Sequence, residues 1–87
     1  MKVKSDFILR EIAGEIVLIP INEMSRKYNG LISMNEVSKT LWNCLQQDTD
    51  RDALVEALLQ DFDVDKEVAE KDVDAFLKKL SRMGILE

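Results

Sequence analysis

Histidine is absent from this 87-residue chain, and cysteine occurs once, as Cys44. Without histidine the chain lacks the most common general base and the most common transition-metal ligand. Cys44 cannot form a disulfide within the chain, and its position on an apolar helical face favours an inert, buried thiol over a nucleophile. The three glycines are isolated, so the chain has no glycine-rich phosphate loop. We therefore expect no cofactor, no bound metal and no enzymatic activity.

Long apolar runs are also missing. No segment approaches the roughly 20 consecutive apolar residues that a membrane-spanning helix needs, so we expect no membrane partner. Residues 1–6 lack the apolar core of a secretory signal, and a single cysteine suits a reducing compartment, which together predict a cytoplasmic protein. The content of 46% hydrophobic and 33% charged residues is typical of a folded domain, and the length fits one domain over residues 1–87.

The net charge of −5 is unevenly placed. Residues 1–47 carry six basic and five acidic side chains, whereas residues 48–87 carry six basic and twelve acidic ones. A protein that binds duplex nucleic acid normally presents a basic surface. The acidic C-terminal half therefore argues against nucleic acid as the partner.

The first third of the chain has the pattern of β-strands. Residues 7–12 and 15–21 mix β-branched and aromatic residues, and Ala13-Gly14 between them predicts a tight turn. Pro20 lacks an N–H and should interrupt the ladder there. Residues 22–28 show no regular pattern, Asn29-Gly30 predicts a second turn or bulge, and residues 31–34 predict a short third strand at the sheet edge.

Apolar residues recur at helical spacing from position 36 onward. The predicted helices are 36–47 with Asn35 as N-cap, a second after Thr49, and a third after Asp65. Gly84 should end the last helix, with Ile85 folding back in a Schellman-type contact. The order β-β-β-α-α-α predicts an α+β fold in which a small three-stranded antiparallel sheet is followed by a three-helix bundle. This arrangement is winged helix-turn-helix-like.

Two aspartate runs have the spacing of calcium ligands. They are residues 48–52 and 61–65, but the position where calcium loops have glycine is Ala53 in the first and Lys66 in the second. Helix caps and solvated turns explain both runs better. Trp42 is an interface hot-spot candidate by residue type, but its position favours the core.

The segment Leu31–Met34 carries neither proline nor charge. If it is an edge strand, nothing in its composition protects the edge, and an extended peptide could pair with it by β-augmentation. An open edge also permits a weak homodimer beside the monomer. The alternative is that the strand is internal, or that residues 22–28 or Ile85-Leu86 cover it. The pattern alone leaves both interpretations open.

Several residues in order along the chain carry a family resemblance. They are Pro20 after the second apolar strand, Met34-Asn35 opening a helix, Leu41-Trp42 within it, Asp72-Val73 and Phe76-Leu77 before Leu80, and the closing Gly84-Ile85-Leu86. In this order the chain resembles the PqqD-like family, the recognition elements for ribosomally made precursor peptides. It departs at Met34, where leucine is usual, and at Gln46-Gln47-Asp48, where an Asp-Gly-type turn is usual.

The resemblance implies a function that periodicity does not show. Such proteins are non-catalytic adaptors that bind the leader segment of a precursor peptide and present it to a modifying enzyme, often a radical S-adenosylmethionine (SAM) enzyme. The leader adds as a strand beside the third strand and is clamped by the third helix. Carried onto this sequence, the peptide-binding residues are Leu31, Ile32, Ser33 and Met34 on the strand, and Asp72, Ala75, Phe76 and Lys79 on the helix.

Two roles stay open within this interpretation. Asp72 and Lys79 carry opposite charges that could set the direction of the bound peptide, and Phe76 is either core or pocket floor, with core favoured by its place in the apolar stripe. A winged-helix DNA-binding regulator is the alternative function, motivated by the predicted architecture alone.

Overall fold

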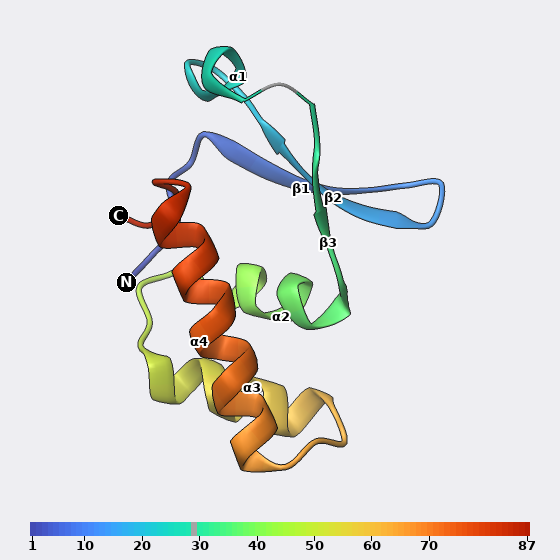
Figure 1. Cartoon of the computed structure of the whole chain (residues 1–87), viewed down its shortest axis with the longest axis vertical. Coiled ribbons are helices and arrows are strands. Elements are labelled where there is room, and N and C mark those ends of the chain that lie inside the picture. The colour runs from blue at the N-terminus through green and yellow to red at the C-terminus, as the bar shows by residue number, and fades with distance from the viewer. Residues whose placement is uncertain (29) are drawn as a thin grey trace.

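A β-hairpin begins the fold in the computed structural model, which describes residues 1–28 and 30–87 (Figure 1). Strands β1 (Phe7–Ile12) and β2 (Glu15–Pro20) pair antiparallel, with Ile12 opposite Glu15. Ala13 and Gly14 both have positive φ, 52° and 83°, which a two-residue type I′ turn requires. The predicted first turn is confirmed. The second predicted turn includes Asn29, which lies outside the described residues.

Strand β3 (Ile32–Met34) pairs antiparallel with the other edge of β2, so the sheet order is β1-β2-β3. The strand begins one residue later than predicted, and Leu31 precedes it with 55% of its surface exposed. Paired residues share one face of the sheet. The face that carries Phe7, Leu18 and Ile32 packs against the helices.

Four helices complete the chain, one more than predicted. The extra one is α1 (Met24–Lys27), a single turn between β2 and β3 that packs against β2. Its residues were predicted to be irregular, because four residues are too short to show a helical period. The element order is therefore β-β-α-β-α-α-α, and the α+β class with a small antiparallel sheet and three main helices is confirmed. The described chain contains no helix long and apolar enough to cross a membrane.

The three main helices are α2 (Glu36–Cys44), α3 (Arg51–Asp61) and α4 (Lys66–Arg82). The predicted caps Asn35 and Asp65 are confirmed, since their side chains accept hydrogen bonds from the amides of Ser38 (2.8 Å) and Val68 (2.9 Å). Helix α2 ends three residues before the predicted position 47.

The predicted cap Thr49 is wrong, and the cap of α3 is Asp50, which accepts from the Ala53 amide at 2.8 Å. A contact distant in sequence explains the shift. The Thr49 amide donates to the Met1 carbonyl at 2.9 Å, and the N-terminal ammonium donates to the Thr49 carbonyl at 2.7 Å. Thr49 thus pairs with the N-terminal segment. The two aspartate runs supply the caps of α3 and α4.

The C-terminus of α4 closes as predicted. The Ile85 amide donates to the Leu80 carbonyl at 2.9 Å and the Gly84 amide donates to the Ser81 carbonyl at 3.1 Å, the two bonds of a Schellman motif. Gly84 has φ of 70°, which glycine adopts without strain. The following Leu86 forms a β-bridge with Val3, so the two ends of the chain lie side by side (Figure 1).

One apolar cluster joins the sheet to the three main helices. Trp42 is 3% exposed and belongs to this cluster, so its predicted core position is confirmed. Phe76 is 6% exposed and belongs to it as well. Cys44 is partly buried against the same cluster, and burial raises the pKa of its thiol. Its side chain is therefore kept in the neutral form.

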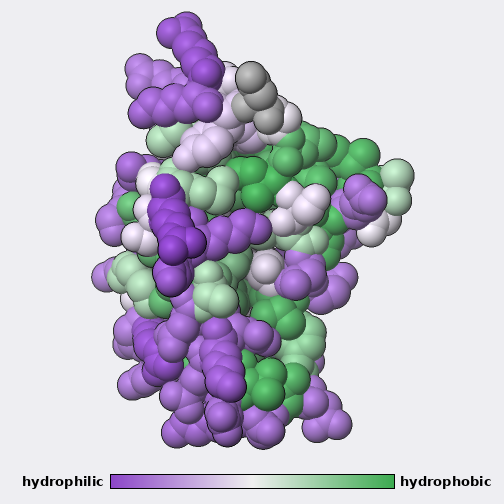
Figure 2. Space-filling view, in the orientation of Figure 1, coloured by the Kyte–Doolittle hydropathy of each residue, from purple (hydrophilic) through white to green (hydrophobic). Residues whose placement is uncertain are grey.

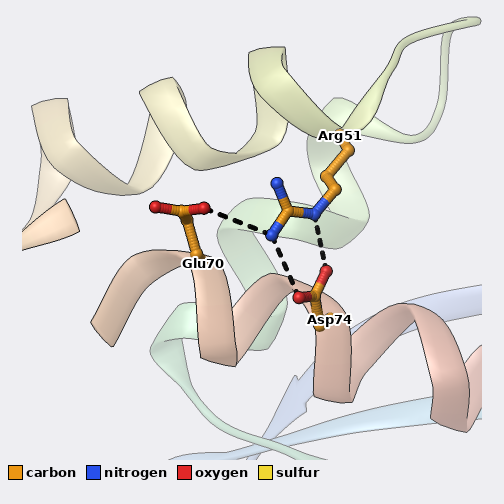
Figure 3. A network of polar contacts seen from close by, with 3 residues as sticks. All are labelled: Arg51, Glu70 and Asp74. Carbon is orange, nitrogen blue, oxygen red and sulfur yellow. Dashed lines mark hydrogen bonds and ion pairs between the residues drawn. The ribbon is translucent and has the colours of Figure 1, made fainter. Parts of the chain in front are cut away.

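Helices α3 and α4 are joined by a polar clamp on their outer side (Figure 3). The Arg51 guanidinium donates to both carboxylate oxygens of Asp74, at 2.6 and 3.0 Å, and to Glu70 at 3.4 Å. The hydrogen bond from Arg51 holds the pKa of Asp74 below its usual range. A bidentate arginine–carboxylate pair fixes direction as well as distance, so the clamp orients α4 relative to α3.

The clamp predicts a pH-dependent contribution to stability. Because the folded-state pKa of Asp74 is lowered, its contribution is present above the unfolded-state value of about 3.9 and is lost as pH falls through the lower folded-state value. We expect Asp74→Asn to lower the urea midpoint at pH 7 and to match the wild type at the lowest pH at which both remain folded. Asp63→Asn, in the exposed loop between the helices, is the control. A difference that persists unchanged at low pH would contradict the clamp.

Candidate functional site

The outer edge of β3 is the first feature of the candidate site. Among residues 1–28 and 30–87, no strand pairs with this edge. The segments considered as covers lie elsewhere: Ile85 and Leu86 pair with the N-terminal segment, and α1 packs against β2. The predicted position of the third strand at the sheet edge is confirmed.

The register shows which backbone groups face this edge. In antiparallel pairs, hydrogen-bonded and non-hydrogen-bonded pairs alternate. The two-residue turn makes Ile12–Glu15 a hydrogen-bonded pair, and the Ile21 amide donates to Asp6 at the far end of the same ladder, at 2.8 Å. The alternation therefore directs the backbone groups of Ile16 and Leu18 towards β3.

On β3 the partners of those two residues are Met34 and Ile32, so both point their backbone groups inward to β2. Ser33, opposite Val17, forms the non-hydrogen-bonded pair, and its N–H and C=O face the open edge. The next inward-facing position of β2 is Pro20, which has no N–H to donate. This explains why the ladder ends at Ile32 and why Leu31 is left outside it.

A hollow of about 240 Å³ lies between α2 and α4, and we call it the α2–α4 hollow. All four helix residues predicted as peptide-binding line it, together with three residues at the start of α2. The lining residues are Asp72, Ala75, Phe76 and Lys79 from α4, and Asn35, Val37 and Ser38 from the other wall. Phe76 is therefore a core residue that also forms part of the hollow's surface.

A second hollow of about 410 Å³ lies between the β1–β2 turn and the end of β3, and we call it the hairpin hollow. Its lining residues are Gly14, Glu15, Ile16, Ser33, Met34, Asn35 and Glu36. Asn35 lines both hollows, so the two meet where β3 ends and α2 begins. Of the four predicted strand residues, Ser33 and Met34 line the hairpin hollow, while Leu31 and Ile32 line neither.

The structure adds residues that the sequence prediction of the site missed. Val37 had been assigned only to the inner stripe of its helix, and Asn35 only to capping. Glu15 lies 20 positions before Asn35, and nothing in its local sequence indicates that the hairpin brings it beside β3. In Figure 2 apolar residues gather over the sheet, and hydrophilic side chains cover much of the helical layer.

The site offers shape and backbone groups more than reactive chemistry. Within the described ranges, no group of three or more histidine, cysteine, aspartate or glutamate side chains is arranged to hold a metal ion. The hollows instead combine apolar surface from Phe76, Ile16 and Met34 with charged side chains at their rims. Such an arrangement fits an extended chain that pairs with an edge and inserts alternate side chains.

Fold and edge together define an α+β domain of the winged-helix-like kind with an unpaired edge strand. The chain belongs to the family described as Coenzyme PQQ synthesis protein D (PqqD), whose model matches residues 15–86. The predicted resemblance is thus confirmed. No curated protein sequence matches the chain.

Two solved structures are similar over almost the full length. One is TbiB1 in complex with the TbiA(β) leader peptide, which is 23% identical with a TM-score of 0.75; the alignment covers 100% of this chain and 95% of that one. The other is lasso peptide synthetase B1 complexed with the leader peptide, which is 15% identical with a TM-score of 0.74, covering 97% and 93%. At these identities the likeness shows a shared fold.

The site's geometry depends on the Asn35 cap, which gives a direct test. We expect Asn35→Ala to lower the free energy of unfolding by about 1 kcal/mol and to speed hydrogen exchange at the Ser38 amide. Asn35→Asp keeps an accepting oxygen and should retain both properties. Equal exchange at Ser38 in the alanine variant and the wild type would show that the cap does not hold the junction.

Proposed function

We propose that this protein is a non-catalytic adaptor that binds the leader segment of a ribosomally made precursor peptide by β-strand addition to β3. It presents that peptide to a modifying enzyme, of which a radical SAM enzyme is the representative kind. The observation that carries the proposal is the open β3 edge beside the α2–α4 hollow. The functional unit is a single PqqD-like domain over residues 1–87.

The backbone of the leader segment would supply most of the affinity. Ser33 presents an N–H and a C=O to the edge, and an added strand pairs with both. Leu31 and Asn35 flank Ser33 at the two-residue interval of outward-facing backbone groups. The peptide-binding set on the strand is therefore Leu31, Ile32, Ser33 and Met34, with Ser33 at its centre.

The side chains of the leader segment would supply selectivity. In an added strand, alternate residues project to the face that Ile32 and Met34 share, which is the helical side of the sheet. There they meet the wall formed by Asp72, Ala75, Phe76 and Lys79. Ala75 is small and leaves room in the wall, while Phe76 offers an apolar surface.

Relatives support this assignment. The family model covers most of the chain, and both similar structures hold a leader peptide. The alternative, a winged-helix DNA-binding regulator, is not favoured, because the helical half carries twelve acidic and six basic side chains.

The proposal predicts where a bound peptide perturbs the protein. The probe is a synthetic peptide with the leader sequence of a short precursor encoded beside this gene. We expect amide chemical-shift changes in the ¹⁵N-labelled protein to cluster at residues 31–38 and 72–79. Changes spread over the whole molecule, or absent at saturating peptide, would contradict binding at this edge.

A second prediction concerns a single backbone group. Ser33→Pro removes the outward-facing N–H, and we expect weaker binding of the same peptide by roughly three- to tenfold, the net value of one hydrogen bond. Ser33→Ala keeps the N–H and removes only the exposed hydroxyl, so it should bind like the wild type. The measurement is calorimetric titration on variants whose circular dichroism matches the wild type. Equal affinity of the folded proline and alanine variants would contradict strand addition at Ser33.

A further inference from the structure

We infer that the peptide-binding edge is electrically polar along its length and selects a segment with a basic side chain at its N-terminal end and an acidic one at its C-terminal end. This inference rests on the proposed function and specifies the class of peptide that the same edge accepts. Two charge groups at opposite ends of β3 carry it.

The end of β3 at Met34 is acidic. Glu15 and Glu36 both line the hairpin hollow, and Asp72 lines the adjoining α2–α4 hollow. The nearby cation of α2 is already engaged, because the Lys39 ammonium pairs with Glu11 of β1 at 2.6 Å. No cationic side chain lines the hairpin hollow among the described residues. A cationic side chain from a bound peptide would meet uncompensated carboxylates there.

The end of β3 at Ile32 is basic. Lys79 and Arg82 lie in the last turn of α4, and Arg26 and Lys27 in the last turn of α1, which shortly precedes β3. The Tyr28 hydroxyl donates to the Met83 carbonyl, so the end of α4 is tied to the chain that leads into β3. Figure 1 shows α1 and the end of α4 on the same side of the molecule as the start of β3.

The two charge groups match the length of a short strand. Seven residues separate Asp72 from Lys79, which is about 10 Å along a helix at 1.5 Å per residue. An extended peptide covers that length in about three residues, so flexible side chains three to five positions apart reach about both ends. The peptide's two charges therefore belong to one β-strand and not to distant parts of a leader.

The direction of the peptide follows from the sheet. Both existing strand pairs are antiparallel, and antiparallel pairing is somewhat more stable per residue than parallel pairing. A strand added antiparallel to β3 begins at the Met34 end and finishes at the Ile32 end. Its basic residue is then N-terminal to its acidic residue.

The test is selection of peptides from a random 12-residue display library on the immobilised full chain, about one strand and its flanks in length. We expect the wild type to enrich lysine or arginine three to five positions before aspartate or glutamate. We expect the double variant Glu15→Lys, Glu36→Lys to enrich an acidic residue at the first of these positions. The control, Glu56→Lys with Glu87→Lys, makes the same charge change away from both hollows and should keep the wild-type pattern.

Affinities of one selected peptide and its analogue with the basic residue changed to glutamate complete the test. We expect the wild type to lose about two- to fivefold per charge contact in the analogue, the worth of a partly exposed ion pair, and the double variant to prefer the analogue. Peptides that bind the β3 edge without charge preference would overturn this inference and leave the proposed function standing. Failure of every variant to enrich any peptide would overturn both.

Discussion

The hydrogen bond from the Ser38 amide to the Asn35 side chain is the constraint on which the site depends. It ends β3 and begins α2 with no connecting loop between them. The open edge at Ser33 and the wall of the α2–α4 hollow are therefore parts of one rigid junction. Helix α4 is held in place from two sides, by the Arg51 clamp on α3 and by the contact of Tyr28 with Met83. An added strand would meet a groove whose two walls are already positioned, which lowers the entropy cost of binding.

Features that depend on residues close in sequence could be predicted. The Ala13-Gly14 turn, the Asn35 and Asp65 caps and the Schellman motif at Gly84 each require groups within about six positions of one another, so the residue types alone indicate them. Edge position followed partly from the shortness of the third strand and its entry directly into a helix. The α4 wall was carried over from the family resemblance, and the structure brings its four residues into one hollow.

Features that depend on distant segments could not be predicted in the same way. Thr49 satisfies the general rule for an N-cap, yet the N-terminus of the chain binds its backbone and the cap moves to Asp50. Pro20 was expected to interrupt a ladder, but only the register shows that its missing N–H ends the β2–β3 pairing at Ile32. Glu15 joins the site because the hairpin folds beside β3, a contact that no local pattern contains.

Net charge and local charge lead to different conclusions for this protein. The total of −5 argues against a nucleic-acid partner, but it hides an edge with carboxylates at one end and ammonium and guanidinium groups at the other. Opposite groups a strand's length apart largely cancel at long range, so they contribute little to the rate of encounter. At contact they favour one direction and one register of the bound strand and penalise the others. Backbone pairing accepts almost any extended sequence, and this charge pattern would give the edge a preference that backbone groups alone cannot supply.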